Sequence, residues 1–200
     1  MHGLINRMLQ VFVEDTYGRS RWDDVLRQAG LGRIEVEAML RHDPALTDQL
    51  AAAVEAQLSR PIGAVLEDVG TYLVSHPNAA SVRRLLRFCG VDFADFLFSL
   101  EDLPGRITLA VPELSVPTIE VIDRDDRIFD ILCRDAVPGF AELVAGLVRA
   151  MADDFGSLAV IDHVTRASEG ECIRVTIIER DFTEGRAFPL VDDATGAPSC

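Results

Sequence analysis

The sequence predicts an α+β fold, with helices in the first half and a mainly antiparallel β-sheet in the second. Up to about residue 103, apolar residues recur at the three- and four-residue spacing of amphipathic helices. After Pro104-Gly105, short β-branched runs separated by turn residues replace that pattern, and one long helical pattern is inserted among them. We therefore expect a helical part over about 1–103, a sheet part over about 104–182 and a polar tail over 183–200.

The helices of the first half each carry a start or stop signal. The first is expected to run from Leu4 to about Tyr17 and to end at Gly18, because glycine adopts the left-handed cap readily. Asp and Pro residues that cap or open helices, and Gly residues that end them, then predict five more: about Trp22 to Gly30, Asp43-Pro44 to Ser59, Pro61 to His76, Ser81 to Cys89, and Phe93 to Leu103 after Asp92.

The second half contains five runs of strand-forming residues, separated by turns. They are Ile107–Val111, Thr118–Ile122, Ile128–Leu132, Leu158–Val164 and Ile173–Ile178. The first three are joined by turns of hairpin length, so neighbouring strands are expected to pair antiparallel. Between the third and fourth runs, apolar residues at helical spacing predict a long helix from about Gly139 to Phe155.

Charge and composition exclude several function classes. The formal net charge is −14, and an acidic surface repels nucleic acids and anionic membranes. All basic residues are arginine, which removes lysine Schiff-base chemistry. No apolar run reaches membrane-spanning length and the N-terminus lacks the features of a secretory leader, so we expect a cytoplasmic protein. The four cysteines include no CxxC pair, so no zinc site is expected.

No pattern predicts catalysis or metal binding. The sequence shows no nucleophile–base arrangement, phosphate-binding loop or calcium loop, so we expect no enzyme activity. The four histidines are isolated, and a surface or packing role is the plain interpretation of each: His2, His42, His76 and His163. The basic residues Arg83, Arg84 and Arg87 are interpreted as a solvated helix face.

Three segments resemble the heme-nitric oxide/oxygen binding (H-NOX) family. They are the opening MHGLINRMLQVFVEDTYG, the stretch LLRFCGVDFADFLFSLEDLPGRITLAVPELSVPTIEV, and FDILCRDAVPGFAELVAGLVRAMADDFG. The resemblance covers about residues 1–182 and implies an H-NOX-like fold. In that family a His ligates heme iron, a Tyr-x-Ser-x-Arg motif binds the heme propionates, and a Pro presses on the porphyrin.

This sequence departs from the family at the positions that hold heme. Pro104 falls where the family has its His, and proline has no side-chain lone pair for iron. The motif positions are Cys133, Asp135 and Val137, which offer the propionates no cation. Only Pro117 is retained. We therefore expect no cofactor, and no signal that depends on an iron–His bond.

Two functions from different classes remain open. One is a regulatory domain that binds a signalling protein, such as a histidine kinase or a cyclic-dinucleotide enzyme, as the resemblance implies. The other is a sensor for an apolar small molecule in a remodelled pocket, with Ile5, Leu9, Leu100 and Pro117 as candidate lining residues. A third alternative keeps heme on an unusual ligand such as Cys133. Because an empty porphyrin-sized void is costly, we expect either inward packing of Ile5 and Leu9 against Leu100 and Pro117, or a bound molecule.

Overall fold

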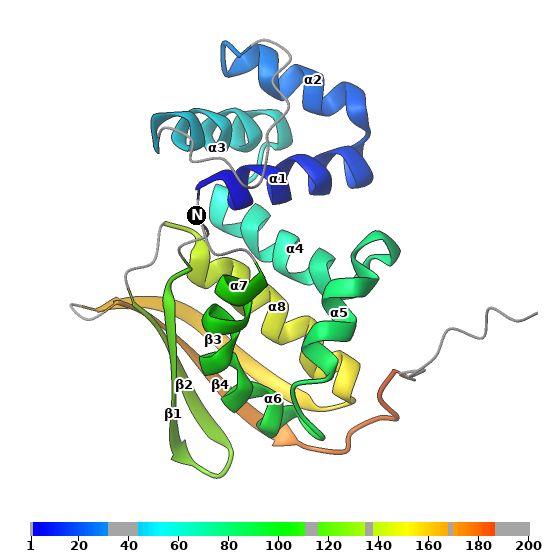
Figure 1. Ribbon diagram of the computed structural model, residues 1–200, viewed down its shortest axis with the longest axis vertical. Helices are drawn as coiled ribbons and strands as arrows, with labels where there is room; N and C mark the ends of the chain where they lie inside the picture. Colours follow the sequence, from blue (N-terminus) through cyan, green and yellow to red (C-terminus); the bar gives the residue numbers. More distant parts are fainter. Residues whose placement is uncertain (1, 32–43, 111–115, 135–137, 168–169, 187–200) are drawn as a thin grey trace, which may run out of the picture.

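The computed structural model describes residues 2–31, 44–110, 116–134, 138–167 and 170–186. Helices precede the strands, as the sequence predicts (Figure 1). The α-helices are α1 (His2–Tyr17), α2 (Arg19–Gln28), α3 (Pro44–Leu58), α4 (Ile62–Ser75), α5 (Ala80–Arg87), α6 (Phe93–Ser99), α7 (Leu103–Ala110) and α8 (Phe140–Phe155). Two 3₁₀ helices, η1 (Pro77–Ala79) and η2 (Leu100–Asp102), connect them.

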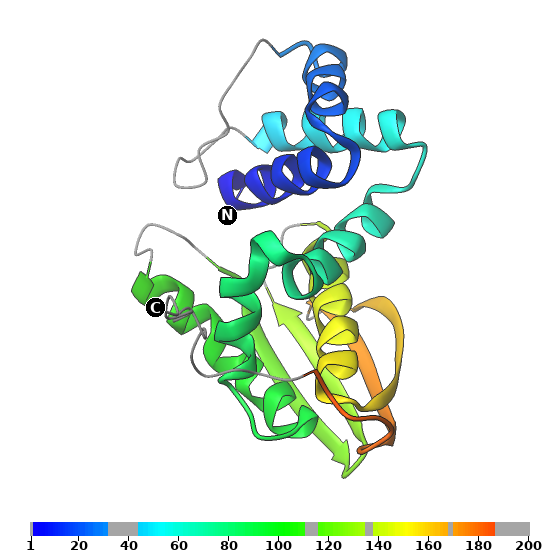
Figure 2. The same ribbon diagram turned by 90° about the vertical axis from the view of Figure 1, so that its right-hand side faces the viewer.

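The described strands form one antiparallel sheet. They are β1 (Thr118–Asp125), β2 (Ile128–Arg134), β3 (Leu158–Ala167) and β4 (Gly170–Glu179), in the order β1-β2-β4-β3. Helix α8 connects β2 to β3 and packs against β3 and β4, so it covers one face of the sheet (Figure 2). The α+β class and the inserted helix are thereby confirmed.

The buried apolar side chains form two clusters. Helices α1–α4 surround one, which includes Trp22, Leu50 and Val69. The other lies between the sheet and helices α5, α6 and α8, and includes Phe96 and Ile131. The chain therefore builds a helical core and a sheet core, and Figures 1 and 2 show helices α1–α3 above the sheet.

Helices α4 and α8 join the two cores at a close crossing. A Cβ atom on Gly146 would lie 1.9 Å from the Glu67 carbonyl oxygen, and one on Gly70 would lie 2.1 Å from the Leu143 carbonyl oxygen. The Thr71 hydroxyl donates a hydrogen bond across the crossing to the Gly146 carbonyl, at 3.3 Å. The two helices can approach this closely only because both residues at the contact lack a side chain.

One expected strand is wrong. Ile107–Val111 was expected to be the first strand, but residues 107–110 belong to α7, and Val111 lies outside the described residues. Pro104 is compatible with this helix because it occupies the first turn, where a backbone N–H has no helical acceptor. The Thr108 hydroxyl donates to the Pro104 carbonyl at 2.9 Å, and Leu109 is 86% exposed. The apolar run therefore belongs to a helix, and the helical part of the chain extends to Ala110 rather than to residue 103.

The other expected elements are present, with ends shifted by a few residues. Strand β1 runs to Asp125 and β3 to Ala167, both longer than the apolar runs that predicted them. Asp43, expected to cap α3, and the tail beyond residue 186 lie outside the described residues. Among the helices that are described, none is long and apolar enough to cross a bilayer.

Candidate functional site

Pro104, at the position where the resemblance implies an iron ligand, is part of a helical path that runs from α6 through η2 into α7. It is the second residue of α7 and is partly buried. The acidic neighbour Asp102 is exposed and lies 3.5 Å from Arg106, so it faces away from the interior. Proline supplies no donor atom for a metal, and its ring is a fixed part of the helix start.

Cys133, at the first position of the propionate motif, lies on β2 and has no exposed surface. Burial raises the pKa of its thiol to about 12, with further contributions from Glu171, Cys172 and Glu142. The thiol is therefore neutral at physiological pH, whereas iron ligation needs the thiolate. Asp135 and Val137 lie outside the described residues.

The remaining porphyrin-side candidates are also enclosed. Leu100 is 1% exposed and belongs to the sheet core together with Cys133 and Val144. Pro117, immediately before β1, is buried. None of Leu100, Cys133 and Pro117 lines the cavity or the groove described below. Pro104, which has no donor atom, and the neutral thiol of Cys133 do not form a donor set that fits heme iron.

A cavity of about 440 Å³ lies on the other side, between α1, α3, α4 and the start of α8. Ile5 and Leu9 of α1 line it together with Ile62 and Leu66 of α4. Leu100 and Pro117 are not among its lining residues. The structure therefore separates the four candidates: Ile5 and Leu9 belong to the helical core, and the expected packing of these two against Leu100 and Pro117 is not formed.

Two residues that line this cavity each carry a buried polar atom without a hydrogen-bond partner among the described residues. The atoms are Oγ1 of Thr47, on α3, and Oε2 of Glu142, in the first turn of α8. Glu142 lies over Gly63 of α4, where an added Cβ would be 3.4 Å from its Cγ. A buried polar atom with no partner costs about 1–3 kcal/mol, so these two atoms are strong candidates for ligand contacts.

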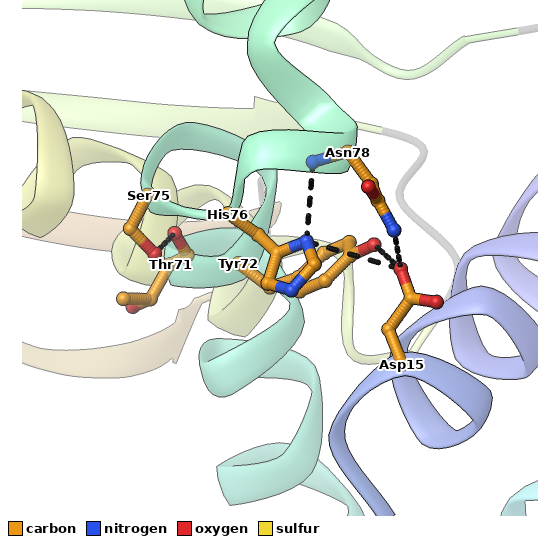
Figure 3. A network of polar contacts seen from close by, with 6 residues as sticks. All are labelled: Asp15, Thr71, Tyr72, Ser75, His76 and Asn78. Atoms are coloured by element: carbon orange, nitrogen blue, oxygen red, sulfur yellow. Dashed lines mark hydrogen bonds and ion pairs between the residues drawn. The ribbon is translucent and has the colours of Figure 1, made fainter. Parts of the chain in front are cut away.

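A polar network joins α1 to the end of α4 (Figure 3). Asp15 accepts hydrogen bonds from the Tyr72 hydroxyl and, at 2.8 Å, from the Asn78 side chain. These bonds lower the pKa of the Asp15 carboxyl, while burial and the carboxylate raise the pKa of Tyr72. His76 stacks on Tyr72 with ring centroids 4.6 Å apart, and its Nδ1 lies 3.8 Å from Asp15. The network therefore links α1 to the C-terminal end of α4 and to η1.

A groove of about 940 Å³ opens between the α5–α6 connection and α7. Phe88, Val91 and Phe98 line it and are 67%, 89% and 44% exposed. Arg106, also in the lining, donates a hydrogen bond to the Cys89 sulfur at 2.6 Å. Exposed aromatic and arginine side chains in one groove are typical of protein-binding surfaces.

The interpretation of the α5 arginines as a solvated face is corrected for Arg83 and Arg87, whereas Arg84 is exposed. Arg83 donates to Asp154 at 2.8 Å, and the Arg87 guanidinium stacks on the Phe155 ring at 3.7 Å. The Asp154 side chain is 1% exposed, so the pair fastens α5 to the end of α8. Sequence spacing could not show this, because residues 83 and 154 are 71 positions apart.

Sequence reasoning also missed Thr47, Glu142 and the Asp15 network. The sequence carries no signal for Glu142, because an acidic residue in the first turn of a helix is favoured by the helix dipole and is ordinary there. Of the histidines, His76 has a packing role as expected, and the other three have side chains outside the described part. Within the described ranges, no three His, Cys, Asp or Glu side chains gather in a way that could hold a metal ion.

The haem-NO-binding (HNOB) family matches residues 2–163, and the chain belongs to this family. The solved structures that it resembles include an H-NOX protein from S. oneidensis in the Fe(II)NO ligation state. The identity is 19% and the TM-score 0.71, over 90% of this chain and 99% of the other. Unliganded Fe(II) H-NOX from K. algicida is 18% identical, with a TM-score of 0.73 over 92% of this chain and 100% of the other. At these identities the structures establish the fold.

Among curated relatives, soluble guanylate cyclase 89Db of Drosophila melanogaster is 20% identical over 172 residues. The match covers 86% of this chain and 26% of the cyclase. Soluble guanylate cyclase gcy-31 of Caenorhabditis elegans is 21% identical, over 80% of this chain and 23% of its own length. The chain thus spans about a quarter of the length of these relatives.

Proposed function

We propose that this protein is a heme-independent regulatory domain that acts by binding a partner protein. The proposal rests on the side-chain chemistry of the residues at the positions where the family holds heme. Pro104 has no donor atom, and Cys133 is a fully enclosed, neutral thiol in the sheet core. Neither position can ligate iron, so a signal in this domain does not depend on an iron–protein bond. The proposal includes no catalytic activity of the domain itself.

The groove beside α7 supports a partner-binding role. Phe88 and Val91 expose apolar surface that folding has left unburied, next to the arginine fork of Arg106. Arginine is among the residues that contribute most to the affinity of protein interfaces, and exposed apolar surface beside it favours burial by a partner. The matched relatives are cyclases of which this chain spans about a quarter, so a catalytic or kinase domain is the partner class we favour. Thiols without close pairs suit a reducing compartment such as the cytoplasm.

The heme part of the proposal is tested by absorbance. Protein purified from a heme-sufficient host should be colourless, and added hemin should be removed by desalting. We also expect the variant Pro104→His with Cys133→Tyr, Asp135→Ser and Val137→Arg to stay colourless, because β2 has no space for a tyrosine at 133. A stoichiometric Soret band that survives desalting of the unaltered protein would overturn the proposal.

The partner part is tested with a matched pair of valines. A histidine kinase, a cyclic-dinucleotide enzyme and a guanylate cyclase catalytic domain are each titrated with the protein, and their activity is followed. Val91→Asp, in the groove, should abolish any response by placing a charge in the apolar contact. Val160→Asp, on the exposed face of edge strand β3, should leave it unchanged. Equal effects of both variants, or no response from any of the three enzymes, would contradict this part.

A second candidate function is favoured by one observation. The cavity lined by Ile5 and Leu9 has a volume of about 440 Å³, within the range of about 300–1,000 Å³ found for small-molecule sites. A sensor domain that has lost heme could use this space for another ligand. The two functions are compatible, because a ligand between α4 and α8 would contact both cores.

A further inference from the structure

The cavity between α1, α3, α4 and the start of α8 is amphipathic in a specific way. Its apolar wall is made by Ile5 and Leu9 on one side and by Ile62 and Leu66 on the other. The polar groups gather at the α3 and α8 edges, where Thr47 faces the same space as Glu142. A ligand that fits must therefore combine an apolar body with a polar end.

The polar end is acidic. Asp48 and Glu55 of α3 and Glu142 of α8 line the cavity, and its lining contains no arginine or histidine among the described residues. A carboxylate ligand would meet like charges there, which is unfavourable in partly buried surroundings. A neutral ligand would leave the carboxylate of Glu142 without a countercharge.

The unpartnered atoms specify what that end must supply. Glu142 Oε2 and Thr47 Oγ1 can both accept hydrogen bonds, and neither has a donor among the described side chains and backbone. An ammonium group offers several N–H donors and a positive charge, so one group can satisfy both atoms. We propose that this cavity binds a small organic ammonium ion, with its charged end at Glu142 and Thr47 and its apolar body against Ile5, Leu9, Ile62 and Leu66.

A ligand at this location would contact both α8 and the helical core. Glu142 is in the first turn of α8, four residues before the Gly146 crossing, and it lies over Gly63 of α4. An ion held between α3 and Glu142 therefore restrains α8 against the helical core. The inference rests on the second function proposed above, in which heme does not occupy this region.

The test compares three probes of similar size and different charge: 2-phenylethylammonium, 2-phenylethanol and 3-phenylpropionate. Binding to the full chain is measured by titration calorimetry at neutral pH and low salt. We expect the ammonium ion to bind at least tenfold more tightly than the alcohol, and the carboxylate not to bind. Added salt should weaken ammonium binding, because part of the affinity is electrostatic. Equal affinity for the three probes would overturn the inference.

Charge-matched variants locate the site. Glu142→Gln should weaken ammonium binding at least tenfold, and Asp123→Asn, which removes one negative charge from an exposed position of β1, should not. Thr47→Val provides a second, independent loss, and Ala51→Phe should block the cavity. Circular dichroism verifies that each variant is folded. Unchanged affinity in Glu142→Gln or in Ala51→Phe would place the ion elsewhere and overturn the inference.

Two failures can be told apart. If the purified protein is colourless and the probes do not discriminate by charge, this inference fails while the heme-independent function stands. If the protein carries a stoichiometric tetrapyrrole, the proposed function itself fails, whatever the probes do.

Discussion

The two sides of the region that resembles a heme pocket have different packing. On the sheet side, Leu100 and Cys133 are enclosed in a continuous apolar core, and Pro117 is buried. On the helical side, Ile5 and Leu9 border a cavity of about 440 Å³ that contains unpartnered polar atoms. The sheet side obeys the rule that interiors are close-packed, and the helical side does not.

Under the proposed heme-independent function, this difference indicates how the fold can be stable without a porphyrin. Filling the sheet side gives stability, because each enclosed side chain adds contacts and removes apolar surface from water. The helical side retains a space and buried polar atoms that cost free energy, and such a cost is typical of binding sites rather than of structural cores. The comparison can be challenged by substitutions whose effects on stability should differ between the two sides.

The largest effect is expected at the crossing that holds the two sides together. Gly146→Ala would place a Cβ 1.9 Å from the Glu67 carbonyl oxygen, so α4 and α8 must separate. We expect a loss of about 4 kcal/mol or more in the free energy of unfolding, measured with urea. Gly105→Ala in α7 is the matched control: nothing lies within 4 Å of its added Cβ, and alanine favours a helix by up to about 1 kcal/mol. Similar stability of both variants would show that the crossing is loose.

The next effect compares one large side chain from each side. Leu100→Ala removes an enclosed side chain from the sheet core and should cost about 3 kcal/mol. Ile62→Ala removes a partly buried side chain from the cavity wall, which already borders space, and should cost about 1 kcal/mol. Urea unfolding of both variants measures the ratio. Equal losses would mean that the helical side is as well filled as the sheet side.

A smaller effect is expected from enlarging a residue on each side. Cys133→Leu adds volume where no space exists and should cost about 1–3 kcal/mol through overpacking. Ala51→Leu adds similar bulk at the cavity wall and should change the unfolding free energy by less than about 0.5 kcal/mol. Thermal unfolding is sufficient to separate the two. A large loss in Ala51→Leu would indicate that the cavity closes in solution.

The sequence predicted the class of fold and most elements because their signals are local. Capping residues and apolar periodicity placed the helices and four strands, but the run Ile107–Val111 was assigned to a strand, because β-branched residues occur in both structures. The resemblance placed Pro104 and Cys133 at positions where the family holds heme, and the prediction that they do not hold it rests on side-chain chemistry alone. Thr47 and Glu142 were missed as cavity residues, because they line the same cavity only through the packing of α3 and α8.

The smallest expected effect concerns the network that attaches α1 to the end of α4. Asp15 accepts hydrogen bonds from Tyr72 and Asn78, which hold the pKa of its carboxyl below the usual range. A group whose pKa is lowered by folding contributes stability above its unfolded pKa, and loses it as pH falls through the folded value. Tyr72→Phe keeps the buried ring and removes the donor, so it should cost about 1 kcal/mol at neutral pH.

That cost should shrink as the solution is acidified from the unfolded pKa of about 4 towards the lower folded pKa, below which Asp15 is protonated in both states. Urea unfolding of the two proteins from pH 7 to pH 3 measures the difference at each pH, and His76, present in both, contributes similarly to each curve. Asp15 is on α1 and Tyr72 is on α4. A difference in unfolding free energy that narrows with acid would therefore show that their hydrogen bond holds together two of the helices that line the cavity. A difference that stays constant with pH would show that the loss does not come from the bond between the Tyr72 hydroxyl and the ionised Asp15, and the attachment of α1 to α4 would then rest on apolar contacts.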